Sequence, residues 1–106
     1  MPSLIRPKLP PEVEVAISFM GNRARADILR HLSILGPSTI GRLQTAVDIS
    51  RPSLNRHLDS LAKAGLVQTD PPAGMRHGKA VVYTVRSARV RELTQAYTSY
   101  VEGMRP

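Results

Sequence analysis

The apolar residues of this chain change their spacing at Gly65. Before that glycine they recur at every third or fourth position, as on one face of a helix, and residues 50–64 show this most clearly. After it, residues 66–69 and 80–85 alternate between apolar and polar side chains, which is typical of β-strands. Helical spacing then returns over residues 87–104. The expected class is therefore mainly α-helical with one β-hairpin.

Capping residues divide the first part of the chain into four helices. Asn and Ser favour helix starts because their side-chain oxygens accept a hydrogen bond from the first turn, whereas Gly and Pro favour helix ends. The predicted caps are Asn22, Ser38, Ser50 and Ser87. The predicted helices cover residues 12–20, 22–35, 38–47, 50–64 and 87–104. The predicted order is therefore α-α-α-α-β-β-α.

The first eleven residues differ in composition from the rest. Residues 1–11 contain four prolines and two cations, and proline disfavours helices and lacks an amide donor. We expect a flexible arm there, with contact between this basic arm and a DNA groove left open. Residues 12–104 are long enough for one domain with its own core.

The charge of the chain favours an anionic partner. Fifteen Lys and Arg oppose eight Asp and Glu, for a net charge of +7. Nine of these cations lie within residues 42–91, against three aspartates. We therefore expect nucleic acid as partner before an anionic membrane. The sequence shows no Cys and no apolar run of the ~20 residues that span a membrane, so we expect a cytoplasmic protein.

The predicted helix over residues 50–64 has an outward face suited to DNA. Arg can bind guanine through two hydrogen bonds, and Asn can bind adenine in the same way. The expected base-reading residues are Arg51, Ser53, Asn55 and Arg56. The expected phosphate-contacting residues are Thr39, Arg42, His57 and Lys63, joined at the hairpin tip by Arg76, His77 and Lys79. An ordinary solvated helix face is the alternative for the helical residues.

Two segments resemble the ArsR-type winged helix-turn-helix repressors. Residues 22–32 read NRARADILRHL, and residues 49–67 read ISRPSLNRHLDSLAKAGLV, which is similar to the recognition helix of that family. The resemblance covers roughly residues 12–102. It implies a winged helix-turn-helix fold and a homodimeric, sequence-specific regulator of transcription, usually a repressor. It also implies base contacts at Arg51, Ser53, Asn55 and Arg56, with His57 at the edge of this set.

The chain departs from the metal-sensing members of that family. Those members carry a Cys pair on the bracing helix, where this chain has Leu-Gln-Thr-Ala at residues 43–46. Others carry Asp and His ligands on the last helix, where this chain has no His. His31, His57 and His77 belong to three different predicted elements. We therefore expect neither a metal nor another cofactor.

The first and last helices carry apolar stripes that suit a two-fold dimer. The predicted interface residues are Val13, Ile17, Met20, Val90, Leu93, Tyr97, Tyr100 and Met104. Their spacing on the last helix is that of a helix–helix seam. The alternatives are that the stripes cover the chain's own core, or that the two tyrosines line a ligand pocket. A dimer would place its recognition helices about 34–36 Å apart on an inverted repeat.

The chain offers no arrangement of residues for catalysis. Its eight carboxylates are scattered, and neither a Gly-rich phosphate loop nor a nucleophile with a base is apparent. The sequence predicts a regulator, and specifically a repressor, that binds a palindromic site on double-stranded DNA in the nucleoid. The alternatives are a DNA-bending or recombination accessory factor of the phage or plasmid type, and a protein-interaction module that reuses the fold.

Overall fold

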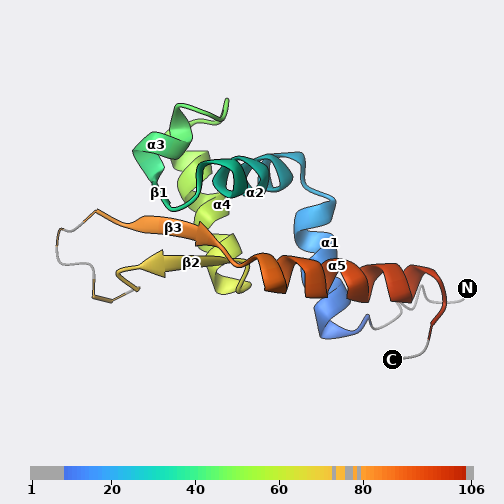
Figure 1. The fold of residues 1–106 in the computed structure, drawn as a ribbon. Coiled ribbons are helices and arrows are strands. Elements are labelled where there is room, and N and C mark those ends of the chain that lie inside the picture. The colour runs from blue at the N-terminus through green and yellow to red at the C-terminus, as the bar shows by residue number, and fades with distance from the viewer. Residues whose placement is uncertain (1–8, 73, 76–77, 79, 105–106) are drawn as a thin grey trace, which may run out of the picture.

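The computed structural model describes residues 9–72, 74–75, 78 and 80–104. Five helices and a small antiparallel sheet account for most of them (Figure 1). The helices are α1 (Pro11–Met20), α2 (Arg23–Leu35), α3 (Ile40–Gln44), α4 (Arg51–Lys63) and α5 (Ser87–Val101). The strands are β1 (Ser38–Thr39), β2 (Val67–Asp70) and β3 (Val82–Val85). The five helices and the hairpin follow the predicted order.

The sheet contains one strand that the sequence pattern did not predict. Strand β3 is central, with β2 on one side and β1 on the other. The two residues of β1 pair with Tyr83 and Val82. Two residues are too few to show an alternating pattern, so apolar spacing could not reveal them. The pairing ties the start of α3 to the hairpin.

Side-chain caps explain where three of the helices begin. Asn22 Oδ1 accepts a hydrogen bond from the amide of Arg25 at 3.0 Å, and Ser50 Oγ accepts one from the amide of Ser53 at 3.4 Å. Both caps were predicted. The cap of α3 is Thr39, whose Oγ1 accepts from the amide of Arg42 at 3.3 Å.

Two predicted caps are wrong. Ser38 is 2% exposed and belongs to β1, and its hydroxyl donates to the carbonyl oxygen of Gly36 at 2.8 Å instead of accepting a bond from a helix. Ser87 is the first residue inside α5, and Arg86 occupies the cap position without a side-chain cap bond. The amide of Arg86 instead donates to the carbonyl oxygen of Leu66, which extends the pairing of the hairpin by one residue. Backbone pairing at the sheet therefore determines where the helices near Ser38 and Ser87 begin.

The core lies where the helices meet the sheet. Leu54, Leu58 and Leu61 of α4 are at most 1% exposed, as their spacing predicted. They join a cluster with buried side chains from the other elements, including Ile28, Leu32, Leu43, Leu66 and Tyr83. Truncating one such leucine to alanine costs about 2–5 kcal/mol of folding free energy. Burial of this stripe fixes which side of α4 faces outward.

Helices α1 and α5 pack against each other beyond the end of β3, on the side of the molecule away from the end of β2 (Figure 1). Arg89 Nη1 lies 3.1 Å from Glu12 Oε1 across this contact, and it also pairs with Glu92. Among the residues described, no helix has both the length and the apolar character needed to cross a membrane.

Candidate nucleic-acid interface

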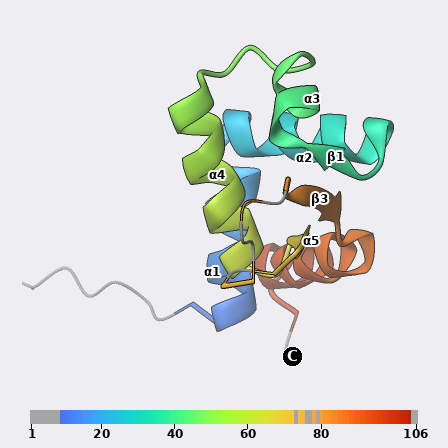
Figure 2. The same ribbon diagram turned by 90° about the vertical axis from the view of Figure 1, so that its left-hand side faces the viewer.

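The outer face of α4 presents polar and basic side chains to solvent. Arg51, Asn55 and Arg56 are exposed, and Ser53 is half-buried beside them. Figure 2 shows α4 standing along one side of the molecule with its outer side uncovered. Within the described part of the chain, neither arginine of this face forms an ion pair. Their charges are therefore available to an anionic partner.

Hydrogen bonds to neutral partners hold both arginines. Arg51 Nη1 donates to Gln44 Oε1 of α3 at 3.0 Å. Arg56 Nη2 donates to Ser53 Oγ, one turn earlier on α4, at 2.9 Å. Neutral partners restrict the side chains without cancelling their charge. Gln44 is a positioning residue that the sequence pattern missed, because contact between two helices cannot be inferred from spacing along one.

A groove of about 520 Å³ runs between the first turns of α4 and the start of β3. We call it the α4–β3 groove; it is lined by Thr39, Ile40, Gly41, Arg51, Asn55, Ala80, Val81 and Tyr83. The structure thus brings three predicted DNA-binding residues, Thr39, Arg51 and Asn55, to one depression. The pairing of β1 with β3 creates it, because that pairing places α3 next to the hairpin.

Known proteins share this arrangement of helices and hairpin. Residues 20–70 match the family described as a helix-turn-helix domain. An ArsR-like transcriptional regulator from Rhodococcus sp. RHA1 is similar in fold, with a TM-score of 0.65 and 22% identity over 87% of this chain and 79% of that one. An ArsR family transcriptional regulator gives a TM-score of 0.64 and 20% identity over 93% and 98% of the two chains. The transcriptional repressor BigR from Xylella fastidiosa gives a TM-score of 0.59 and 22% identity, over 82% of this chain and 84% of that one.

No curated protein sequence matches the chain significantly. The similarity to these structures nevertheless shows the fold. The chain has the winged helix-turn-helix fold that these regulators share. In this fold α3 and α4 form the helix-turn-helix, α4 is the recognition helix, and the β2–β3 hairpin is the wing. The predicted fold class is confirmed, and the match over residues 20–70 supports a DNA-binding regulator of transcription.

The remaining predicted phosphate contacts lie at different ends of the helix-turn-helix. Arg42 is exposed on α3 near the groove. Lys63 is exposed at the end of the recognition helix, about 18 Å along its axis from Arg51 at 1.5 Å per residue. The predicted wing-tip residues Arg76, His77 and Lys79 lie outside the described residues.

His57 contacts another helix of the same chain. Its Nδ1 accepts a hydrogen bond from Arg25 Nε of α2 at 3.2 Å. Burial of the ring lowers the pKa of His57, and the nearby positive charges of Arg25 and Arg56 lower it further. The neutral ring therefore carries its proton on Nε2, because Nδ1 acts as acceptor. Arg25 is a second residue that the sequence pattern missed, since 32 residues separate it from His57.

The eight predicted dimer residues separate into two groups. Val13 is 2% exposed and Leu93 is fully buried, so these two belong to the chain's own core and not to an open surface. The other six are exposed or half-buried: Ile17, Met20, Val90, Tyr97, Tyr100 and Met104. Val90 and Tyr97 are half-buried and pack against the core cluster. The alternative that the stripes cover the core therefore applies to these two as well as to Val13 and Leu93.

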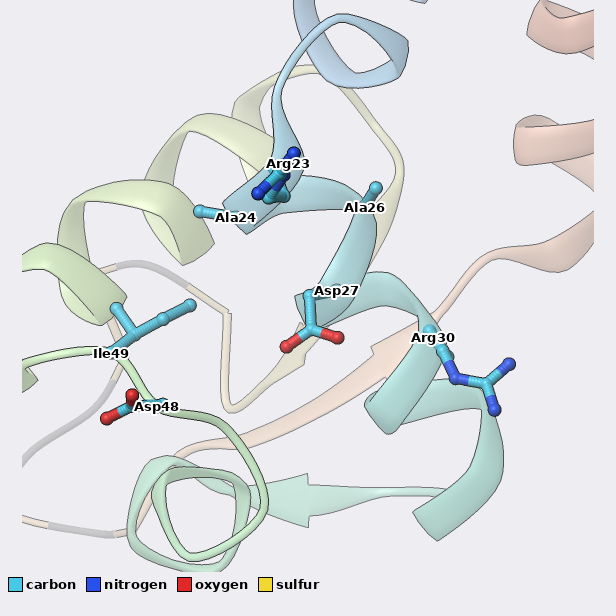
Figure 3. A pocket seen from close by; sticks show the side chains of 7 residues that line it. All are labelled: Arg23, Ala24, Ala26, Asp27, Arg30, Asp48 and Ile49. Carbon is cyan, nitrogen blue, oxygen red and sulfur yellow. The ribbon is translucent and has the colours of Figure 1, made fainter.

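A second hollow, of about 670 Å³, lies between α2 and the turn before the recognition helix. Figure 3 shows Asp27 and Asp48 on facing sides of it, with Arg30 directed away from both. Asp27 Oδ1 lies 3.3 Å from His31 Nδ1. Two carboxylates line this hollow together with two arginines, whereas no carboxylate lines the α4–β3 groove. Among the described residues, no three His, Asp or Glu side chains gather in a way that could hold a metal ion.

Proposed function

We propose that this chain is a homodimeric transcriptional repressor that binds an inverted-repeat site in double-stranded DNA. The observation that carries the proposal is the exposed pair Arg51 and Arg56 on the outer face of the recognition helix, both held by neutral partners. Two restrained, uncompensated guanidinium groups on a helix of this fold suit the acceptor groups of guanine in the major groove. No step of this function is catalytic, and its place of action is the nucleoid in the cytoplasm.

The proposed division of labour follows the positions of the side chains. The recognition helix reads bases through Arg51, Ser53, Asn55 and Arg56. The residues proposed to hold phosphates are Thr39, Arg42, His57 and Lys63, with Arg76, His77 and Lys79 of the wing. A phosphate contact fixes register on the duplex, and a base contact supplies the sequence preference.

A second copy of the chain is the proposed partner at the α1–α5 side. Met104 is 60% exposed, Tyr100 42%, Met20 41% and Ile17 40%, so an apolar surface is available there. A stable interface buries about 1,200–2,000 Å² in total. A two-fold axis through this surface would present two recognition helices to successive major grooves, which gives a palindromic site.

Selection of bound duplexes from a random-sequence pool tests the proposal. The expected result is one short inverted repeat, with half-sites spaced by one turn of DNA and binding that weakens steeply with salt. Tandem sites with strong bending would point instead to an accessory factor. Weak binding without any recovered sequence would overturn DNA regulation and favour a protein-interaction module.

A further inference from the structure

Gly41 is the one glycine of this chain that the fold does not explain. Of the seven glycines, five have a positive φ, which disfavours other residues. A Cβ added at Gly21 would approach the carbonyl oxygen of Ile17 at 3.2 Å. A Cβ added at Gly41 would meet only Thr39 Oγ1, at 4.0 Å, and the φ of Gly41 is not positive.

Glycine at this position is costly for the fold itself. Gly41 lies in helix α3 and is exposed to solvent. Alanine favours the helix more strongly, because glycine loses more backbone freedom when the helix forms. The chain therefore keeps an unfavourable residue where its own atoms leave room for a larger one. A close approach by something outside the chain accounts for that choice.

The surroundings of Gly41 indicate what approaches. Gly41 lines the α4–β3 groove together with Arg51 and Asn55 of the recognition helix and Thr39 at the cap of α3. No carboxylate is among the lining residues, and Gln44 holds the guanidinium of Arg51 without neutralising it. The groove therefore combines an apolar lining with the polar side chains of Thr39 and Asn55 and one positive charge that no lining carboxylate opposes, which suits a sugar–phosphate chain.

We propose that the α4–β3 groove seats the sugar–phosphate backbone of one DNA strand, and that residue 41 is glycine because this strand passes in contact with its Cα. The proposal rests on the proposed function and adds a residue that limits how deeply the DNA enters. With the strand at Gly41, the base edges of the same strand face Arg51 and Asn55. A side chain at position 41 holds the strand away from both.

Gly41→Ala tests the proposal through two opposite effects. The variant is expected to keep or raise the melting temperature, by up to about 2–6 °C. Its affinity for DNA is expected to fall about tenfold or more, the loss that one charge-assisted contact represents. Gly41→Leu should lower the affinity further while remaining folded. Ala88→Leu, at an exposed position of α5 outside the groove, is the control and should bind as the wild type does.

The binding probes are a duplex recovered by the wild-type protein from a random pool and its scrambled counterpart. Both should bind Gly41→Ala more weakly, and the salt dependence should become shallower because a phosphate contact is lost. If Gly41→Ala binds the recovered duplex as tightly as the wild-type protein does, this inference is overturned and the proposed function stays intact. A lowered melting temperature in Gly41→Ala would also overturn it, because the fold would then require the glycine. Failure of the wild-type protein to bind any duplex would overturn both proposals.

Discussion

Arg25 donates a hydrogen bond from Nε to Nδ1 of His57, at 3.2 Å, and so joins α2 to the recognition helix. Arg25 Nη1 also donates to the carbonyl oxygen of Ser18 in α1 at 3.3 Å. The side chain of Arg25 therefore links α1, α2 and the recognition helix α4. Three elements are held in register by a single guanidinium group.

Loss of this link should destabilise the fold modestly. Arg25→Ala removes the donors to His57 and Ser18, and a net hydrogen bond contributes about 0.5–1.5 kcal/mol. The free energy of unfolding in urea should fall by about that amount per bond lost. Arg23→Ala, at an exposed position on the first turn of α2, is the control and should stay close to wild type. Equal stability of the two variants would contradict the role given to Arg25.

The surroundings of the His57 ring make stability depend on pH. Burial and the charges of Arg25 and Arg56 lower the pKa of His57 below its ordinary value of 6.5, so the unfolded chain binds a proton more readily than the folded chain. The stability that the neutral His57 ring contributes is therefore fully present above pH 6.5. It is lost as the pH falls from 6.5 toward the lower pKa of His57 in the folded state. His57→Asn keeps an acceptor but does not titrate. Unfolding in urea at about pH 7.5 and about pH 5.5 should show a smaller loss for this variant than for wild type.

Base reading and phosphate binding should respond differently to mutation. Arg56→Ala should reduce the preference for the recovered duplex over a scrambled one by about 1–3 kcal/mol. Lys63→Ala should weaken both duplexes alike and reduce the salt slope by about one unit. Titrations by fluorescence anisotropy at several salt concentrations separate the two effects. Identical behaviour of the two variants would refute the division between reading and positioning.

A charge placed on the α1–α5 surface should disrupt the proposed dimer. Tyr100→Glu puts a carboxylate on an apolar surface, where its desolvation is unfavourable. Sedimentation should then report a monomer, and affinity for the full inverted repeat should drop toward that for a half-site. Ile34→Glu is a matched control, because Ile34 is 65% exposed at the end of α2 and belongs to no proposed interface. Dissociation caused by both variants alike would argue against this surface.

Truncation within the stripe of the recognition helix should be far more damaging than truncation at the surface. Leu58 is fully buried, and Leu58→Ala should lower the free energy of unfolding by about 2–5 kcal/mol. Ile34→Ala, at an exposed site, should change it by less than about 0.5 kcal/mol. Thermal melting of the two variants provides the comparison.

The sequence predicts what depends on spacing along one element. The stripe of Leu54, Leu58 and Leu61 determines both the buried and the outward side of the recognition helix, so the exposure of Arg51 and Arg56 follows from the sequence alone. The role of Gly65 also follows from the sequence. It comes just after the recognition helix and has a φ of 80°, a conformation that glycine favours.

What the sequence could not predict depends on contacts between elements. The bond between Arg25 and His57, the restraint of Arg51 by Gln44 and the pairing of β1 with β3 all join segments whose relative positions are set by packing. Val13 and Leu93 show the same limit from the other side. Their spacing fits a dimer interface as well as the chain's own core. The packing of α1 on α5 decides between the two, and it buries both side chains in the core.

The central place of β3 in the sheet has a mechanical consequence. Only Arg86 separates the end of this strand from the start of α5, and its amide is anchored to Leu66. Strand and helix are therefore joined without a loop between them. In the proposed dimer, a few degrees of rotation at the α1–α5 surface would therefore move both hairpins relative to the DNA and change the half-site spacing that the two copies can bind.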